Sequence, residues 1–225
     1  MLIVKKHSET RQTLLAAGNW LWSLFTINLA WFGINFPVIL TLILMFSMPN
    51  GRVMIPGAVV LVLMLSLFTL PSLVAVFRAV DQWQVNGDGN YARVVLKGWR
   101  QALPDFLVNL TLATALMIIV LLLKASVGDI LVRSGLLVWF GALLLVVVAR
   151  SYLVGLARHD VTLGGFIIAN GGKLVLATGV FILLMGINVF LKLAFMILVA
   201  SVSLAAFISY QLLNGAPVKN EVREK

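Results

Sequence analysis

The chain has 225 residues, of which 61% are hydrophobic and only 11% are charged, and its mean hydropathy is +1.06. A water-soluble domain carries roughly a quarter of charged residues, so this composition excludes a soluble globular protein. The formal net charge of +9 does not indicate nucleic-acid binding, because the basic residues flank apolar runs and do not form one patch. Cysteine is absent, which excludes disulfides, thiolate metal sites and cysteine nucleophiles.

Six long apolar runs follow a short basic tail. They cover residues 20–46, 55–76, 106–123, 136–149, 174–191 and 193–213, and the fourth is short unless 130–134 belongs to it. A helix needs about 20 apolar residues to cross about 30 Å of hydrocarbon, whereas a barrel strand alternates polar and apolar residues. The runs therefore predict an all-α protein, a polytopic transmembrane helical bundle of six spans, in one membrane domain over residues 1–225.

Basic residues are concentrated in alternate gaps between these runs, and a five-span count would break that alternation. Because cytoplasmic loops are enriched in Lys and Arg, the pattern predicts a multi-pass protein of the cell membrane with both termini in the cytoplasm. The alternative is five spans, since almost no loop separates the last two runs at Lys192. The predicted inner segments carry Lys5, Lys6, Arg11, Arg78, Arg93, Lys97, Arg100, Arg150, Arg158, Lys173, Lys219, Arg223 and Lys225. The predicted outer gaps carry Arg52, Lys124, Arg133 and Lys192.

The largest predicted cytoplasmic piece is the segment 77–104. Its Gly- and Asn-rich middle, 86–90, predicts a turn, and 91–103 then predicts an amphipathic helix. On that helix Arg93, Lys97 and Arg100 lie together, opposite an apolar face. This pattern is typical of a helix lying in the membrane interface with its cations toward lipid phosphates. The basic face either docks a partner or belongs to a simple interfacial connector.

Polar residues inside the runs are few. Asn28, Trp31 and Asn35 share one face of the first span, and Asn109 and Asn188 in the third and fifth spans are their natural partners. Amides at membrane depth need hydrogen-bond partners, so we expect this face to point into the bundle. The five residues form either a polar path for a small solute or a set of hydrogen bonds that hold the helices together.

The sixth run carries small residues at helical spacing. Ser201, Ala205 and Ser209 form a ridge that allows another helix to approach closely. This ridge predicts helix packing and carries no information about an activity.

Catalytic chemistry is missing from the sequence. All eight Asp and Glu residues lie in gaps, tails or span ends, whereas a proton-coupled transporter usually has a carboxylate or His within its spans. We expect Asp105 to begin the third span at the positive end of its helix dipole, and the glycine pairs 164–165 and 171–172 to mark a loop. No nucleophile with a base, metal cluster or phosphate-binding motif is present, so we expect no enzyme and no cofactor.

Three segments together resemble a known family. They are Asn-Leu-Ala-Trp at 28–31 with Pro37 beyond it, Pro-Ser-Leu-Val-Ala-Val-Phe-Arg at 71–78 running to Trp83, and Tyr-Ala-Arg-Val-Val-Leu-Lys-Gly-Trp-Arg-Gln-Ala at 91–102. They are similar to the YesL-like family of bacterial integral membrane proteins, over roughly residues 15–110 and again at 209–214. The chain departs from the family in the longer stretch between Pro37 and Pro71 and in Leu-Pro-Ser at 70–72, where Gly-Pro-Ala is usual.

The resemblance implies a functional context. Genes of the family often neighbour carbohydrate-uptake systems of the ABC type and two-component sensors, which suggests an accessory or regulatory role in sugar uptake, with such a transporter or sensor as partner. The alternative is a small autonomous transporter that uses the polar face of the first span. A homo-oligomer remains open under both hypotheses, and the lipid bilayer is the expected surroundings in each.

Overall fold

A computed structural model describes residues 2–47, 54–87, 89–126, 128–158, 160–190 and 201–214. Within these stretches, side chains are described for residues 18–45, 55–187 and 201–214. The described residues contain helices and no strand. The elements are α1 (Leu2–Ser47), α2 (Met54–Met64), the π-helical turn η2 (Leu65–Thr69), α3 (Leu70–Asn86), α4 (Tyr91–Ala102), the 3₁₀ turn η3 (Leu103–Asp105), α5 (Phe106–Ala125), α6 (Ile130–Gly155), α7 (Leu163–Phe190) and α9 (Ser201–Asn214). The all-α prediction is confirmed.

Five stretches are long and apolar enough to cross a membrane. They are Gly18–Met45, Ile55–Asn86, Tyr91–Ala125, Ile130–Gly155 and Leu163–Ile187. The fourth includes 130–134, which resolves the short fourth run. The sixth predicted run, 193–213, lies partly outside the described residues, and its described part is α9. The described helices are those of a multi-pass membrane bundle.

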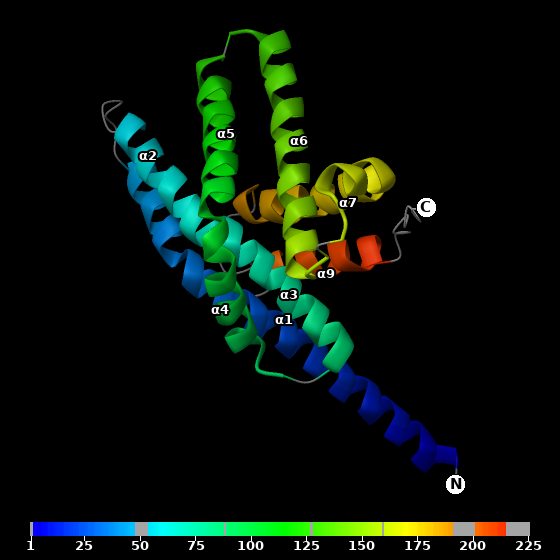
Figure 1. Cartoon of the computed structure of the whole chain (residues 1–225). Helices are drawn as coiled ribbons and strands as arrows, with labels where there is room; N and C mark the ends of the chain where they lie inside the picture. The colour runs from blue at the N-terminus through cyan, green and yellow to red at the C-terminus, as the bar shows by residue number, and fades with distance from the viewer. Residues whose placement is uncertain are drawn as a thin grey trace.

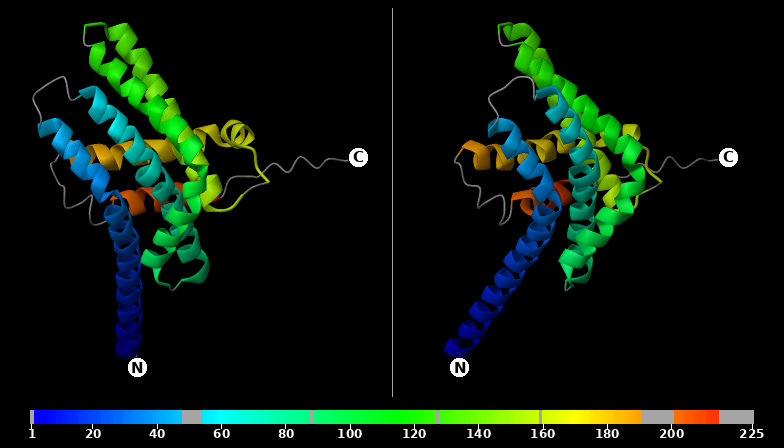
Figure 2. Two further views of the ribbon diagram at one scale, coloured as in Figure 1. Left: turned by 60° about the vertical axis from the view of Figure 1, so that its left-hand side comes forward. Right: turned by 90° about the vertical axis from the view of Figure 1, so that its left-hand side faces the viewer.

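The helix α3 lies at the centre of the arrangement, with α1, α4, α6 and α9 packed around it (Figure 1). Phe77 of α3 is fully buried and contacts Tyr152 of α6 edge to face, with ring centroids 5.9 Å apart. Helix α6 crosses α3 closely at Gly155, where an added Cβ would lie 2.9 Å from the Phe77 Cβ. Helices α5 and α6 form a hairpin that projects from this centre (Figure 1), and the N-terminal part of α1 extends away on another side (Figure 2).

Polar side chains join α3 to the end of α6 and to α9. The Arg78 Nε of α3 donates to the Gly155 carbonyl at the end of α6 at 3.4 Å. The Tyr210 hydroxyl of α9 donates to the Asp81 carboxylate of α3 at 3.0 Å. Helices α7 and α9 pack against each other and run in opposite directions (Figure 1).

One local prediction was wrong. The glycine pairs 164–165 and 171–172 lie inside α7 and not in a loop, because the helix runs through them with one departure from helical geometry at Asn170 (φ −123°, ψ 18°). Helix α7 packs against α6 and α9, which overrides the weak local helix preference of the glycines. The helix of the second run continues past position 76 to Asn86, where the predicted turn begins.

Candidate functional site

Asn28 connects α1 to the beginning of α9. Its side chain is 0% exposed, and its Oδ1 accepts hydrogen bonds from the backbone N–H groups of Val202 and Ser203, both at 3.1 Å. Because α9 begins at Ser201, these donors belong to its first turn, where helices generally lack internal acceptors for backbone N–H groups. The Asn28 side chain of α1 therefore accepts hydrogen bonds from the first turn of α9, as an N-cap residue does in its own helix.

Asn35 connects α1 to the junction of η2 and α3. It is 1% exposed, and its Nδ2 donates to the Trp31 carbonyl and to the Ser72 hydroxyl, both at 2.9 Å. Its Oδ1 accepts from the Thr69 hydroxyl at 2.7 Å. The amide thus uses both its donor and its acceptor side within the protein, and two of its three partners, Thr69 and Ser72, come from η2 and α3.

Helix α4 also contacts the π-helical turn. A π-helical turn shifts the regular i→i+4 hydrogen bonds and is frequently found at functional positions. The Trp99 indole donates to the Leu67 carbonyl at 2.9 Å, and its ring stacks on Phe68 with centroids 5.9 Å apart. Asn35 of α1 and Trp99 of α4 therefore both form hydrogen bonds with the π-helical turn.

Trp31 lies on the same face of α1 as the two asparagines. It is buried, and its indole Nε1 has no hydrogen-bond acceptor among the described residues. An unpaired indole N–H in an apolar surrounding is energetically unfavourable. It is the one polar group of this α1 face for which the described part of the chain supplies no acceptor.

Asn109 has a different partner from the expected one. It is buried, and its Oδ1 accepts from Nη1 of Arg150 at 2.9 Å, while Nη2 of Arg150 forms an ion pair with Asp105 at 2.8 Å. Asp105 stands at the start of α5 and makes no capping hydrogen bond, and its Oδ2 accepts from Arg150. Asn188 lies in the last turn of α7, outside the described side chains.

The sequence analysis counted Arg150 among the loop bases and missed its partners in α5. The hydropathy pattern ends the fourth span at residue 149, yet α6 continues to Gly155 and places Arg150 within the helix. Its side chain is 12% exposed against 47% for Asp105, and an arginine at this depth needs a partner because desolvation of an unpaired charge is costly. The i, i+4 spacing of Asp105 and Asn109 was the signal that could have found the cluster.

The basic face of α4 is exposed as expected, but the rest of that prediction is corrected. Arg93, Lys97 and Arg100 are exposed, and the opposite face is covered by α3 and α1 instead of lipid. Gly98 allows the close approach, since an added Cβ would lie 3.0 Å from the Ala75 Cβ and 3.1 Å from its Cα. The helix is therefore part of the bundle and presents its cations outward.

The ridge of small residues on α9 faces the protein. Ser201, Ala205 and Ser209 are all buried, and the Ser209 hydroxyl donates to the Ala177 carbonyl of α7 at 3.4 Å. The ridge lies where α9 packs against its neighbours.

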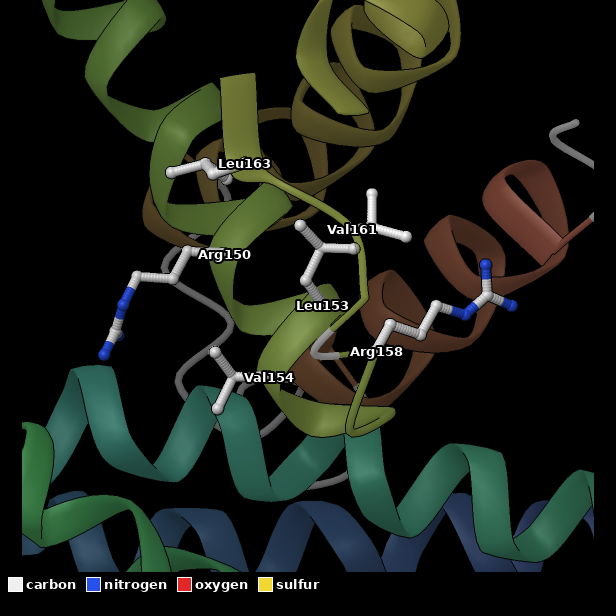
Figure 3. A pocket seen from close by; sticks show the side chains of 6 residues that line it. All are labelled: Arg150, Leu153, Val154, Arg158, Val161 and Leu163. Atoms are coloured by element: carbon white, nitrogen blue, oxygen red, sulfur yellow. The ribbon is translucent and has the colours of Figure 1, made fainter. Parts of the chain in front are cut away.

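A pocket of about 220 Å³ lies between the end of α6 and the start of α7. It is lined by Arg150, Leu153, Val154, Arg158, Val161 and Leu163. The two guanidinium groups point away from each other, so the pocket between them is walled by apolar side chains and arginine stems (Figure 3).

Comparison with known proteins adds no relative: no family model matches the chain, and neither the curated proteins nor the solved structures contain a match. The geometry alone therefore defines the class. The chain is a multi-pass helical membrane protein whose described interior polar groups, at Asn28 and Asn35, are bonded to other helices.

Proposed function

We propose that this protein is a non-enzymatic accessory subunit in the cell membrane, with both termini in the cytoplasm, which packs against a carbohydrate transporter or its sensor. The sugar-uptake context rests on the resemblance to the YesL-like family. The observation that carries the accessory role is the closure of the α1 face: Asn28 and Asn35 are fully buried and bonded to α9 and to the η2–α3 junction.

A transport path requires polar groups that water or a solute can reach. The amide of Asn35 is already occupied by Trp31, Thr69 and Ser72. The pocket described above is lined by neither Asn28 nor Asn35. These contacts favour a closed bundle in which the asparagines hold helices together, at roughly 1 kcal/mol for each interhelical hydrogen bond.

Two surfaces are available to a partner. The α4 cations Arg93, Lys97 and Arg100 are exposed and suit an acidic surface of a cytoplasmic subunit. The α5–α6 hairpin exposes large apolar side chains such as Leu107 and Trp139, which suit contact with lipid or with the spans of a transporter.

The autonomous transporter remains the second candidate because of one observation. The indole N–H of Trp31 is buried between Asn28 and Asn35 along α1 and lacks an acceptor in the described part of the chain. A solute with an oxygen acceptor would satisfy it. This candidate requires the α1 face to open during transport.

The variants Asn28→Leu and Asn35→Leu separate the two candidates. Under the accessory hypothesis, Asn28→Leu leaves two buried N–H groups of α9 unpaired, so we expect a loss of about 2 kcal/mol or more in stability and poor assembly in detergent. The readouts are the apparent melting temperature and the elution profile. Variants that assemble like the wild type but abolish solute flux in proteoliposomes would instead identify the α1 face as a transport path.

The partner is tested by affinity purification from native membranes at native expression. We expect a transporter subunit or sensor kinase in stoichiometric amount, lost when Arg93, Lys97 and Arg100 are changed to Glu. Arg133→Glu, an exposed arginine near the start of α6, is the matched control and should keep the partner. A clean homo-oligomer from both preparations contradicts the accessory role.

A further inference from the structure

The pocket between α6 and α7 combines an apolar wall with a cation at its rim. Leu153, Val154, Val161 and Leu163 form the wall, and Arg158 stands at one side (Figure 3). Its volume of about 220 Å³ is below the roughly 300–1,000 Å³ of pockets that enclose a whole drug-sized ligand. It therefore fits one part of an amphiphile whose remainder stays outside.

The charge of Arg158 is not neutralised within the described part of the chain. Its guanidinium donates to the Asn214 Oδ1 at 3.4 Å and lies 5.4 Å from the centroid of the Tyr152 ring. The one ion pair among the described residues joins Arg150 to Asp105, and Asp160 is exposed and forms none with Arg158. A partly buried arginine without a carboxylate is suited to a phosphate.

The start of α7 adds a second positive contribution. Leu163 lines the pocket and is also the first residue of this 28-residue helix. Thr162 precedes it, and its Oγ1 accepts from the Gly165 N–H at 3.3 Å. The positive end of the helix dipole therefore lies at the rim of the pocket, where it favours an anion.

The position of the pocket favours a lipid over a soluble anion. It lies at the end of the span Ile130–Gly155, and the next turn of α7 exposes Ile168 to 88%. We infer that this pocket binds an anionic phospholipid, with the phosphate at Arg158 and the first part of an acyl chain against Leu153 and Val161. Basic pockets of this kind at the inner ends of spans suit anionic head groups.

The test uses the full chain, purified in mild detergent and depleted of lipid. Native mass spectrometry counts bound lipid after addition of palmitoyl-oleoyl phosphatidylglycerol or the matching phosphatidylcholine, and the melting temperature is followed in parallel. We expect one tightly held phosphatidylglycerol per chain. Arg158→Gln should weaken it about tenfold, whereas Arg133→Gln, at the far end of α6, should retain it.

A second variant and a soluble anion complete the test. Val161→Trp fills the apolar wall and should also reduce phosphatidylglycerol retention, which keeps the test decisive if Arg158→Gln fails to fold. Equal retention of phosphatidylcholine, or unchanged binding in both pocket variants, overturns the proposal. Equal stabilisation by inorganic phosphate or glycerol phosphate would assign the site to a soluble anion and overturn the lipid assignment.

Discussion

Ala157 ends α6 in a conformation that suits glycine. Its φ is 52°, its N–H donates to the Val154 carbonyl at 3.2 Å, and the N–H of Arg158 donates to the Leu153 carbonyl at 3.0 Å. This pair of bonds is the Schellman ending, in which the left-handed position is usually Gly because a Cβ is disfavoured there.

We expect Ala157→Gly to raise the free energy of unfolding by roughly 0.5–1 kcal/mol, because it removes that steric cost. The apparent melting temperature in detergent measures the effect. Gly87 also has positive φ, at 72°, with ψ −38°, so the reverse change Gly87→Ala is the opposite control and should destabilise the protein. A lower melting temperature for Ala157→Gly would show that the left-handed position is not strained.

The sequence predicted which polar residues point into the bundle, but not the groups to which they form hydrogen bonds. The spacing of Asn28 and Asn35 on one face correctly predicted that both point into the bundle, where they are buried. The acceptor role of Asn28 toward Val202 could not be predicted, because its partner is a backbone group 174 positions away. The expected pairing of these asparagines with Asn109 was wrong, since Arg150 holds Asn109 instead.

At the scale of elements, the contact of α4 with α3 depends on one glycine. A Cβ at Gly98 would lie 3.0 Å from the Ala75 Cβ and 3.1 Å from its Cα. Neither atom can move without moving α3, so the helices must separate when the Cβ is added. The same contact orients Trp99 toward the π-helical turn.

We expect Gly98→Ala to destabilise the protein by about 1–3 kcal/mol, the usual cost of overpacking. Gly33→Ala is the control, because a Cβ there meets nothing within 4 Å, and it should be neutral or stabilising by up to about 1 kcal/mol. Both are measured as shifts in melting temperature. A Gly98→Ala variant as stable as Gly33→Ala would mean that α4 is not seated on α3.

Elements were predictable where the apolar run was long. The apolar runs predicted where the helices lie but not where they end. Helices that pack on each other can continue beyond the apolar run that would span the hydrocarbon core. Thus α3 extends to Asn86 and α6 to Gly155. The sequence predicted a loop at Gly171 and Gly172, although α7 contains them. Composition shows the weak helix preference of glycine but not the packing that opposes it.

For the whole molecule, the contact between the ends of α6 and α9 bears on the number of membrane crossings. Arg158, just after α6, donates to Asn214 at the end of α9, at 3.4 Å. If both ends lie on one side of the membrane, the chain between them crosses an even number of times. Helix α7 is long and apolar enough for one crossing, so we expect a second crossing in the predicted run 193–213. This parity favours six spans over five.

The absence of native cysteine allows the topology to be tested directly. We expect Asn86→Cys and Lys225→Cys to react with a membrane-impermeant maleimide only in inverted vesicles, and Gly128→Cys, in the α5–α6 connection, only in intact spheroplasts. The reason is that α5 and α6 run out from and back to the side on which α3 ends. Labelling of Lys225→Cys from the same side as Gly128→Cys would mean an odd number of crossings after α6, five spans in total, and a contact between Arg158 and Asn214 that does not form in the membrane.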